Sequence, residues 1–203
     1  MEERLCYATV KGDLKSLQEI IAIDDSILDR VLVGIFREKN PLHVAISTGQ
    51  TRVVLKLLEI KPGFAEVLDK ELGAAIHIAS AKGHLEIVKA LANVSPEMCL
   101  TCDGDGNNPV HIAAMKGQVQ VLEELAGTNS HIGYIAHVKV NRGDTILHLC
   151  VKYDLFECLK LLLEMIPCPY FVNDADVEGN TILHGAVFEK RLEVRPQSRL
   201  SDC

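Results

Sequence analysis

The sequence has few aromatic residues, no excess of positive charge and no long hydrophobic run. Among its 203 residues there is no tryptophan, aromatic residues make up 4 %, and the formal net charge is −7. Proteins that bind nucleic acids usually carry a basic surface, and those that bind single strands also stack bases on aromatic side chains. The composition therefore argues against DNA or RNA as a partner. The apolar runs, such as residues 31–36, are far shorter than the ~20 residues that span a bilayer, so no direct membrane span is predicted.

A secretory signal and the motifs of catalytic or metal sites are also missing. The chain starts with Glu2, Glu3 and Arg4 and has no apolar run after them, so we expect a cytoplasmic protein. Seven cysteines at irregular spacings favour reduced thiols. Cys99 and Cys102 are spaced like half of a zinc or redox site, but no second pair completes it. No nucleophile elbow, phosphate-binding loop or dinucleotide fingerprint occurs. We expect no enzymatic activity, no cofactor and no metal.

What the sequence does contain is an internal repeat. It is centred on five histidines with separations of 34, 34, 37 and 36 residues: His43, His77, His111, His148 and His184. A degenerate copy at residues 4–8 has Cys6 in the histidine position. Six residues after that position stand Gly12, Gly49, Gly83 and Gly117, and then Asp154. Glycine there predicts that a short helix ends in a left-handed conformation, which Asp tolerates better than most residues.

An apolar pattern at i, i+3 and i+4 follows each of these turns and predicts a second helix. One such helix pair cannot bury its apolar side, whereas stacked pairs can. The segments Asn-Pro-Leu-His-Val-Ala at 40–45 and Asn-Pro-Val-His-Ile-Ala at 108–113 resemble the ankyrin repeat. The resemblance runs from about residue 4 to 192 and implies an all-α ankyrin-repeat solenoid of stacked helix-turn-helix units with short inter-repeat hairpins.

The sixth unit departs from this pattern, because Pro196 falls inside its expected second helix. We expect an ankyrin-repeat domain over residues 1–193, with about five repeats and a truncated sixth, and a disordered tail over residues 194–203. A chain stopped within a repeat leaves its last unit without a polar cap. Weak self-association through the C-terminal end is therefore expected.

A narrower resemblance rests on the segments between repeats. Residues 61–68, 95–100 and 166–172 each carry proline followed by apolar residues, and residues 138–148 add to the pattern. Together they resemble plant ankyrin proteins that carry a C-terminal membrane domain named for a Pro-Gly-Gly motif, a domain absent from this sequence. The resemblance implies a role in stress and immune signalling at a membrane and no catalytic residues.

We accordingly expect a non-catalytic protein–protein interaction module, in signalling, plant defence or innate immunity. Two alternatives stay open. One is a soluble shortened form of a membrane-anchored signalling protein, held at the cytoplasmic face of the plasma membrane through a longer form or a partner. The other is a regulatory or inhibitory subunit of an enzyme.

The candidate binding residues lie in the tips between repeats and at the ends of the short helices. Loops on a rigid scaffold often bind partners, although polar residues are also expected in any solvated turn. The tip residues are Arg37, Lys39, Asp69, Lys70, Glu71, Asp103, Asp105, Asn141, Arg142, Asp176 and Glu178. The helix residues are Ser47, Lys82, Lys116 and Lys152. Net acidity favours a protein partner with a basic or mixed surface. The five histidines are interpreted as structural, because residues one repeat apart cannot share a metal ion at ligand distances of ~2 Å.

Overall fold

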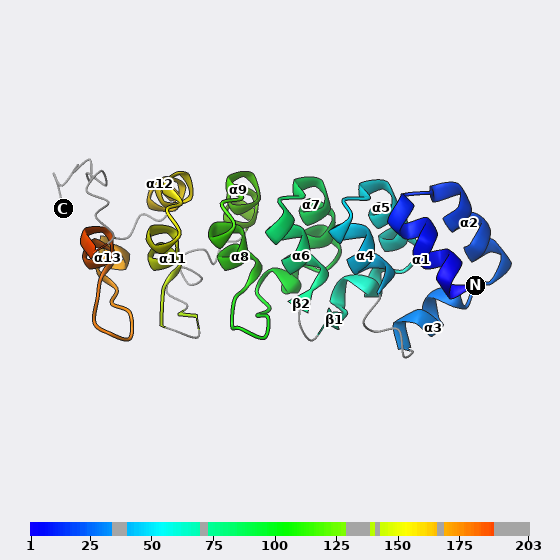
Figure 1. Cartoon of the computed structure of the whole chain (residues 1–203), viewed down its shortest axis with the longest axis horizontal. Coiled ribbons are helices and arrows are strands. Elements are labelled where there is room, and N and C mark those ends of the chain that lie inside the picture. Colours follow the sequence, from blue (N-terminus) through cyan, green and yellow to red (C-terminus); the bar gives the residue numbers. More distant parts are fainter. Residues whose placement is uncertain (34–39, 70–72, 129–138, 141–142, 166–168, 189–203) are drawn as a thin grey trace. The chain divides into compact units, whose positions relative to one another are not determined.

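The structure is a computed structural model that describes residues 1–33, 40–69, 73–128, 139–140, 143–165 and 169–188 (Figure 1). The chain divides into two compact units, Met1–Ser130 and His131–Cys203. The tail predicted over residues 194–203, including Pro196, lies outside the described residues. None of the described helices combines the length and the apolar character needed to cross a membrane.

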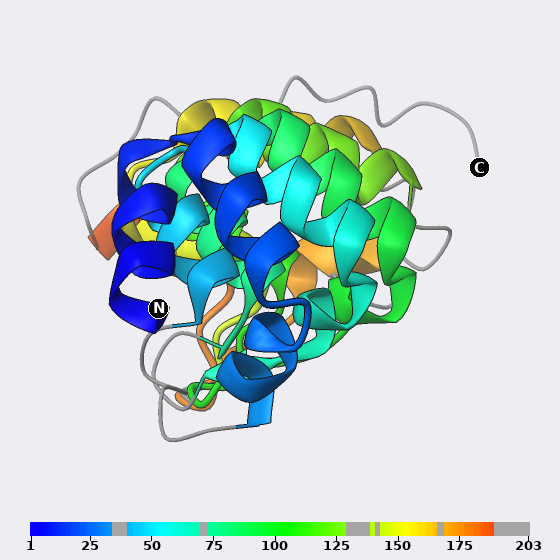
Figure 2. The same cartoon turned by 90° about the vertical axis from the view of Figure 1, so that its right-hand side faces the viewer.

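The first unit is a row of helix pairs. Its first helices are α1 (Glu2–Lys11), α4 (Pro41–Ser47), α6 (Ala75–Lys82) and α8 (Pro109–Met115). Each is followed by a helix of ten residues: α2 (Leu14–Ile23), α5 (Thr51–Ile60), α7 (Leu85–Val94) and α9 (Val119–Thr128). A further helix, α3 (Ile27–Val33), follows α2. Because α1 packs on α4, α4 on α6 and α6 on α8, the pairs stack in chain order; Figure 2 looks at this row from the end that carries α1 and α2.

The helices α4 and α8 begin at Asn-Pro pairs for a local reason. The side chain of Asn40 accepts a hydrogen bond from the N–H of Leu42 at 2.9 Å, and Asn108 accepts one from the N–H of Val110 at 3.1 Å. These bonds satisfy N–H groups that the first turn of a helix leaves without a partner. Proline suits the first helical position because it has no N–H to satisfy there.

The turns inside the helix pairs confirm the conformation predicted from the sequence. The φ angles of Gly12, Gly49, Gly83 and Gly117 are 72°, 71°, 75° and 67°, and that of Asp154 is 58°. The turn also lies against the next repeat, since a Cβ atom on Gly83 would collide with the side chain of Gln118. Glycine at this position therefore serves both the left-handed turn and the stacking of repeats.

The core of the first unit lies between its two rows of helices. Each of the eight paired helices contributes a fully buried aliphatic side chain: Leu5, Leu17, Leu42, Leu57, Ile76, Ile87, Val110 and Leu122. In α5 the buried residues Val53, Val54, Leu57 and Leu58 lie on one face, as expected of an amphipathic helix. Burial of each helix pair against its neighbours is the main stabilising interaction in such a row.

Three of the segments between repeats form 3-10 helices that begin at proline. They are η2 (Pro62–Glu66), η3 (Pro96–Cys99) and, in the second unit, η4 (Pro169–Asn173). Phe64 in η2 and Phe171 in η4 are fully buried, and Cys99 in η3 is also buried. After η2 the chain forms a short antiparallel hairpin of β1 (Leu68–Asp69) and β2 (Gly73–Ala74), with Leu68 opposite Ala74. The apolar residue after each proline thus fixes the connection to the core.

The described part of the second unit contains one complete helix pair and a further first helix. The elements are α11 (Ile146–Lys152), α12 (Phe156–Met165), η4 and α13 (Ile182–Phe188). Helix α11 packs on both α12 and α13. The core of the second unit includes Leu147, Cys150, Leu159, Leu162 and Phe171.

Adjacent tips also pack on one another in the second unit, and this contact can be tested with two glycines. Gly143 and Gly179 have φ angles of 74° and 83°. A Cβ atom on Gly143 would lie 3.0 Å from the backbone N of Val177, whereas one on Gly179 would meet no described atom within 4 Å. Gly179→Ala should cost about 1–2 kcal/mol of unfolding free energy through its backbone conformation alone, and Gly143→Ala should cost more. Urea unfolding measures both, and equal losses would contradict the packing of tip on tip.

Candidate protein-interaction surface

The repeat histidines form hydrogen bonds with the backbone at the start of their own helix. In four repeats the imidazole Nδ1 accepts a hydrogen bond from the backbone N–H three residues earlier. The donors and distances are Ala74 to His77 at 3.1 Å, Asn108 to His111 at 3.4 Å, Thr145 to His148 at 3.3 Å and Thr181 to His184 at 3.1 Å. The ring thus satisfies an N–H group at the entrance to the helix.

The other ring nitrogen reaches the next repeat. Nε2 of His77 lies 2.9 Å from the carbonyl oxygen of Thr101, and Nε2 of His148 lies 2.9 Å from that of Asn180. Because Nδ1 accepts a hydrogen bond, a neutral imidazole must carry its proton on Nε2, which donates to these carbonyls. Each of the two rings therefore joins its own turn to the following tip, and both of its nitrogens are engaged.

The tip between α7 and α8 is built around one carboxylate. Oδ1 of Asp103 accepts hydrogen bonds from the N–H groups of Asp105 at 2.9 Å and of Asn107 at 2.8 Å. The Gly106 N–H donates to the carbonyl of Asp103 at 3.1 Å, which closes the turn. Asp103 therefore holds the tip in place, whereas the side chain of Asp105 is exposed.

The tip before α13 has the same construction in the second unit. Oδ1 of Asp176 accepts from the N–H groups of Glu178 and Asn180, both at 2.8 Å. Burial raises the pKa of Asp176, but the N–H groups of Asn180 and Glu178 donate to its carboxylate and outweigh that effect, so the pKa lies below the usual range. Glu178 is the exposed member of this pair.

The other predicted tip residues divide into two groups. Six lie outside the described residues: Arg37, Lys39, Lys70, Glu71, Asn141 and Arg142. Asp69 is placed by its backbone in β1, opposite Gly73. Of the eleven, the structure thus brings Asp103 and Asp105 together in one tip of the first unit, and Asp176 and Glu178 together in one tip of the second.

The predicted residues at the ends of the short helices are exposed. Ser47, Lys82 and Lys116 lie on the surface of the first unit and Lys152 on that of the second. Lys152 is partly engaged, because its Nζ lies 3.0 Å from Oδ2 of the buried Asp144. The two residues line a small hollow of about 160 Å³ together with His148 and Asp176.

Apolar residues on the outer side of the first helices were not predicted as binding residues. Tyr7 and Val10 on α1 are 66 % and 39 % exposed, and Val44, Ile112 and Met115 are half-buried at equivalent places in α4 and α8. These residues stand one or four places after the histidine position. The sequence signal that could have identified them is an apolar residue one or four places after the histidine position in each repeat.

Three of the described cysteines, Cys99, Cys150 and Cys158, have the character of structural thiols. Burial raises the pKa of Cys99, Cys150 and Cys158, which keeps these thiols protonated and weakly nucleophilic. Cys99 is buried in η3 whereas Cys102 is exposed, so the two thiols have different surroundings. In the part of the chain that the structure describes, no three His, Cys, Asp or Glu side chains gather to hold a metal ion.

Stacked helix-turn-helix units define the class of helical repeat proteins. Comparison with known proteins specifies the family within this class. The family described as ankyrin repeats (3 copies) matches residues 5–97 and 42–133, and the ankyrin repeat matches residues 142–174. The chain belongs to the ankyrin-repeat family, as its sequence predicted. The crystal structure of the ankyrin repeat domain of Bcl-3, described as a unique member of the IkappaB protein family, is similar with a TM-score of 0.79 and 20 % identity. The match covers 93 % of this chain and 81 % of that one, and at this identity it shows the fold alone. A search of curated proteins gives no match.

The role of His77 predicts a pH dependence of stability. Burial lowers the pKa of His77 below its ordinary value of 6.5 and outweighs the opposite effects of the Thr101 carbonyl and Asp103. The unfolded chain therefore binds more protons near pH 6.5, and the free energy of unfolding should fall as the pH drops below that value. His77→Gln should lose roughly 1–3 kcal/mol at pH 7.5 and depend less on pH. Urea unfolding at pH 7.5 and 5.5 measures this, and an unchanged pH dependence in the variant would contradict it.

Proposed function

We propose that the chain is a non-catalytic protein-binding module that presents variable side chains on a fixed scaffold. The observation that carries the proposal is the difference between the two carboxylates in the tip between α7 and α8. Asp103 is engaged in the turn through two backbone N–H groups, whereas the neighbouring Asp105 points outward. The scaffold does not depend on the outward side chain, so that side chain is available for a partner.

A partner with a mixed surface suits the charges of this module. The tip residue Asp105 is acidic, whereas Lys82 and Lys116 at the ends of α6 and α8 are basic and exposed. Exposed charges of both signs in the first unit favour a partner that offers the complementary pattern, which mainly sets specificity and association rate. Weak self-association through α13 is part of the proposal, because its Leu183, Val187 and Phe188 are exposed.

Within this function we assign the chain to signalling in stress or immune responses. The support is the resemblance of its proline-led connections to those of plant ankyrin proteins that carry a membrane domain. Here these connections are the segments that bury Phe64 and Phe171. A cytoplasmic location agrees with the buried thiols of Cys150 and Cys158, because such thiols stay reduced there.

A pull-down with matched variants tests the binding surface. One variant carries Lys82→Ala, Asp105→Ala and Lys116→Ala, all exposed on short helices or a tip of the first unit. The control carries Arg52→Ala, Glu86→Ala and Glu123→Ala, which are exposed on the second helices. Proteins recovered by the wild type from its native tissue are identified by mass spectrometry, and their affinity is then measured with purified components.

The wild type and the control should recover the same stoichiometric partner. The surface variant should bind it at least ~10-fold more weakly, a loss of about 1.4 kcal/mol. Circular dichroism verifies that all three proteins are folded. Equal affinity of both variants for that partner would place its site elsewhere and contradict the proposed surface.

A further inference from the structure

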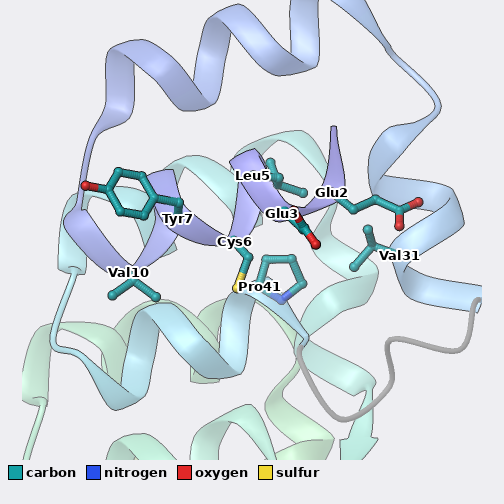
Figure 3. A pocket seen from close by; sticks show the side chains of 8 residues that line it. All are labelled: Glu2, Glu3, Leu5, Cys6, Tyr7, Val10, Val31 and Pro41. Atoms are coloured by element: carbon teal, nitrogen blue, oxygen red, sulfur yellow. The ribbon is translucent and has the colours of Figure 1, made fainter.

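A hollow of about 360 Å³ lies along α1, where this helix faces α3 and the start of α4 (Figure 3). Its lining is mainly apolar and comes from Leu5, Cys6, Tyr7, Val10, Val31 and Pro41. Glu2 and Glu3 line it at the N-terminal end of α1. We call this hollow the α1 groove. Its volume is in the range of ordinary binding sites.

Helix α1 has apolar residues on two sides, although packing in the row requires them on only one. One side packs into the repeat core through Leu5, Ala8 and Thr9, all buried. The other side presents Tyr7 and Val10 to solvent, with 66 % and 39 % of their surface exposed. A helix at the edge of a row needs only the first side. An exposed apolar side next to a hollow is typical of an interaction site, whereas isolated exposed apolar residues are common on any protein.

Helix α1 carries acidic residues at its start and a basic residue at its end. Glu2 and Glu3 lie in the first turn of α1 and Lys11 in its last turn. Glu3 forms no ion pair with any residue that the structure describes, and Glu2 lies 3.9 Å from Nε of Arg30. Nζ of Lys11 lies 5.8 Å from the centre of the Tyr7 ring. From residue 3 to residue 11 the helix rises about 12 Å. The groove is therefore acidic at the end lined by Glu2 and Glu3, and Lys11 lies just beyond Val10 at its other end.

We propose that the α1 groove binds a short segment of a partner protein that carries complementary charges. Two apolar side chains of the segment enter the hollow beside Tyr7 and Val10. A Lys or Arg on one flank meets Glu2 and Glu3, and an Asp or Glu on the other flank meets Lys11. A length of about 12 Å corresponds to roughly four extended residues or two turns of helix. The inference rests on the proposed function and names the chemistry of the segment that is recognised.

A displayed library of random 12-residue peptides, selected on the intact chain, tests this inference. Enriched peptides are synthesised, and their affinities are measured by fluorescence anisotropy for the wild type, Tyr7→Ser, Glu3→Lys and Lys11→Glu. The controls are Phe156→Ser on α12 and Glu19→Lys on α2, both exposed and outside the groove. Tyr7 and Glu3 are themselves exposed, so the variants should unfold in urea like the wild type.

The enriched peptides should share two apolar residues with a basic residue on one flank and an acidic residue on the other. Tyr7→Ser, Glu3→Lys and Lys11→Glu should each weaken binding at least ~10-fold, while the two controls leave it unchanged. Selection repeated on the Glu3→Lys protein should replace the basic flank by Asp or Glu. That reversal of preference separates recognition by charge from a general loss of affinity.

Three results would overturn the inference. Peptides that bind the wild type, Tyr7→Ser and Glu3→Lys equally well would show a protein-binding module whose site is not the groove, and the proposed function would stand. A library without any enriched peptide would remove the groove as a peptide site, and the pull-down alone would then decide the proposed function. A dimer in sedimentation velocity that is lost in Tyr7→Ser would assign the groove to a second copy of this chain.

Discussion

The positions of the tips that follow His77 and His148 depend on one polar interaction that acts in two directions. The imidazoles of His77 and His148 each accept a backbone N–H of their own repeat and lie at hydrogen-bonding distance from a carbonyl of the next one. Apolar burial supplies most of the stabilisation of stacked repeats, but it does not fix the position of a tip. The imidazole fixes that position through its two nitrogens, because a tip that moved would leave a buried polar group without a partner.

This constraint separates the residues that build the surface from those that can vary on it. Asp103 and Asp176 are committed to their own turns, as the histidines are to theirs. Asp105 and Lys116 make no such contribution and are exposed. A scaffold of this kind can exchange its outward residues at little cost in stability, so the same fold serves many partners. In the α1 groove, Val31 of α3 forms part of the wall.

Local patterns were enough to predict the helix pairs and their turns. The spacing of apolar residues and the glycine six places after the histidine are both short-range signals, and Gly83 and Asp154 show the predicted left-handed conformation. The roles within a tip were not predictable in this way. Asp103 and Asp105 are the same residue type two places apart, and only the three-dimensional turn decides which carboxylate it uses. The α1 groove combines Tyr7 with Val31 and Pro41, which come together only through packing.

The protonation of the repeat imidazoles is the most direct test of this account. Two-bond ¹H–¹⁵N correlation spectra of the folded protein at pH 7.5 distinguish the two neutral forms of each ring from the charged form. We predict that the imidazoles of His77 and His148 carry their proton on Nε2, because Nδ1 accepts the backbone N–H and Nε2 donates to the next repeat. A neutral ring with its proton on Nδ1 would contradict this prediction.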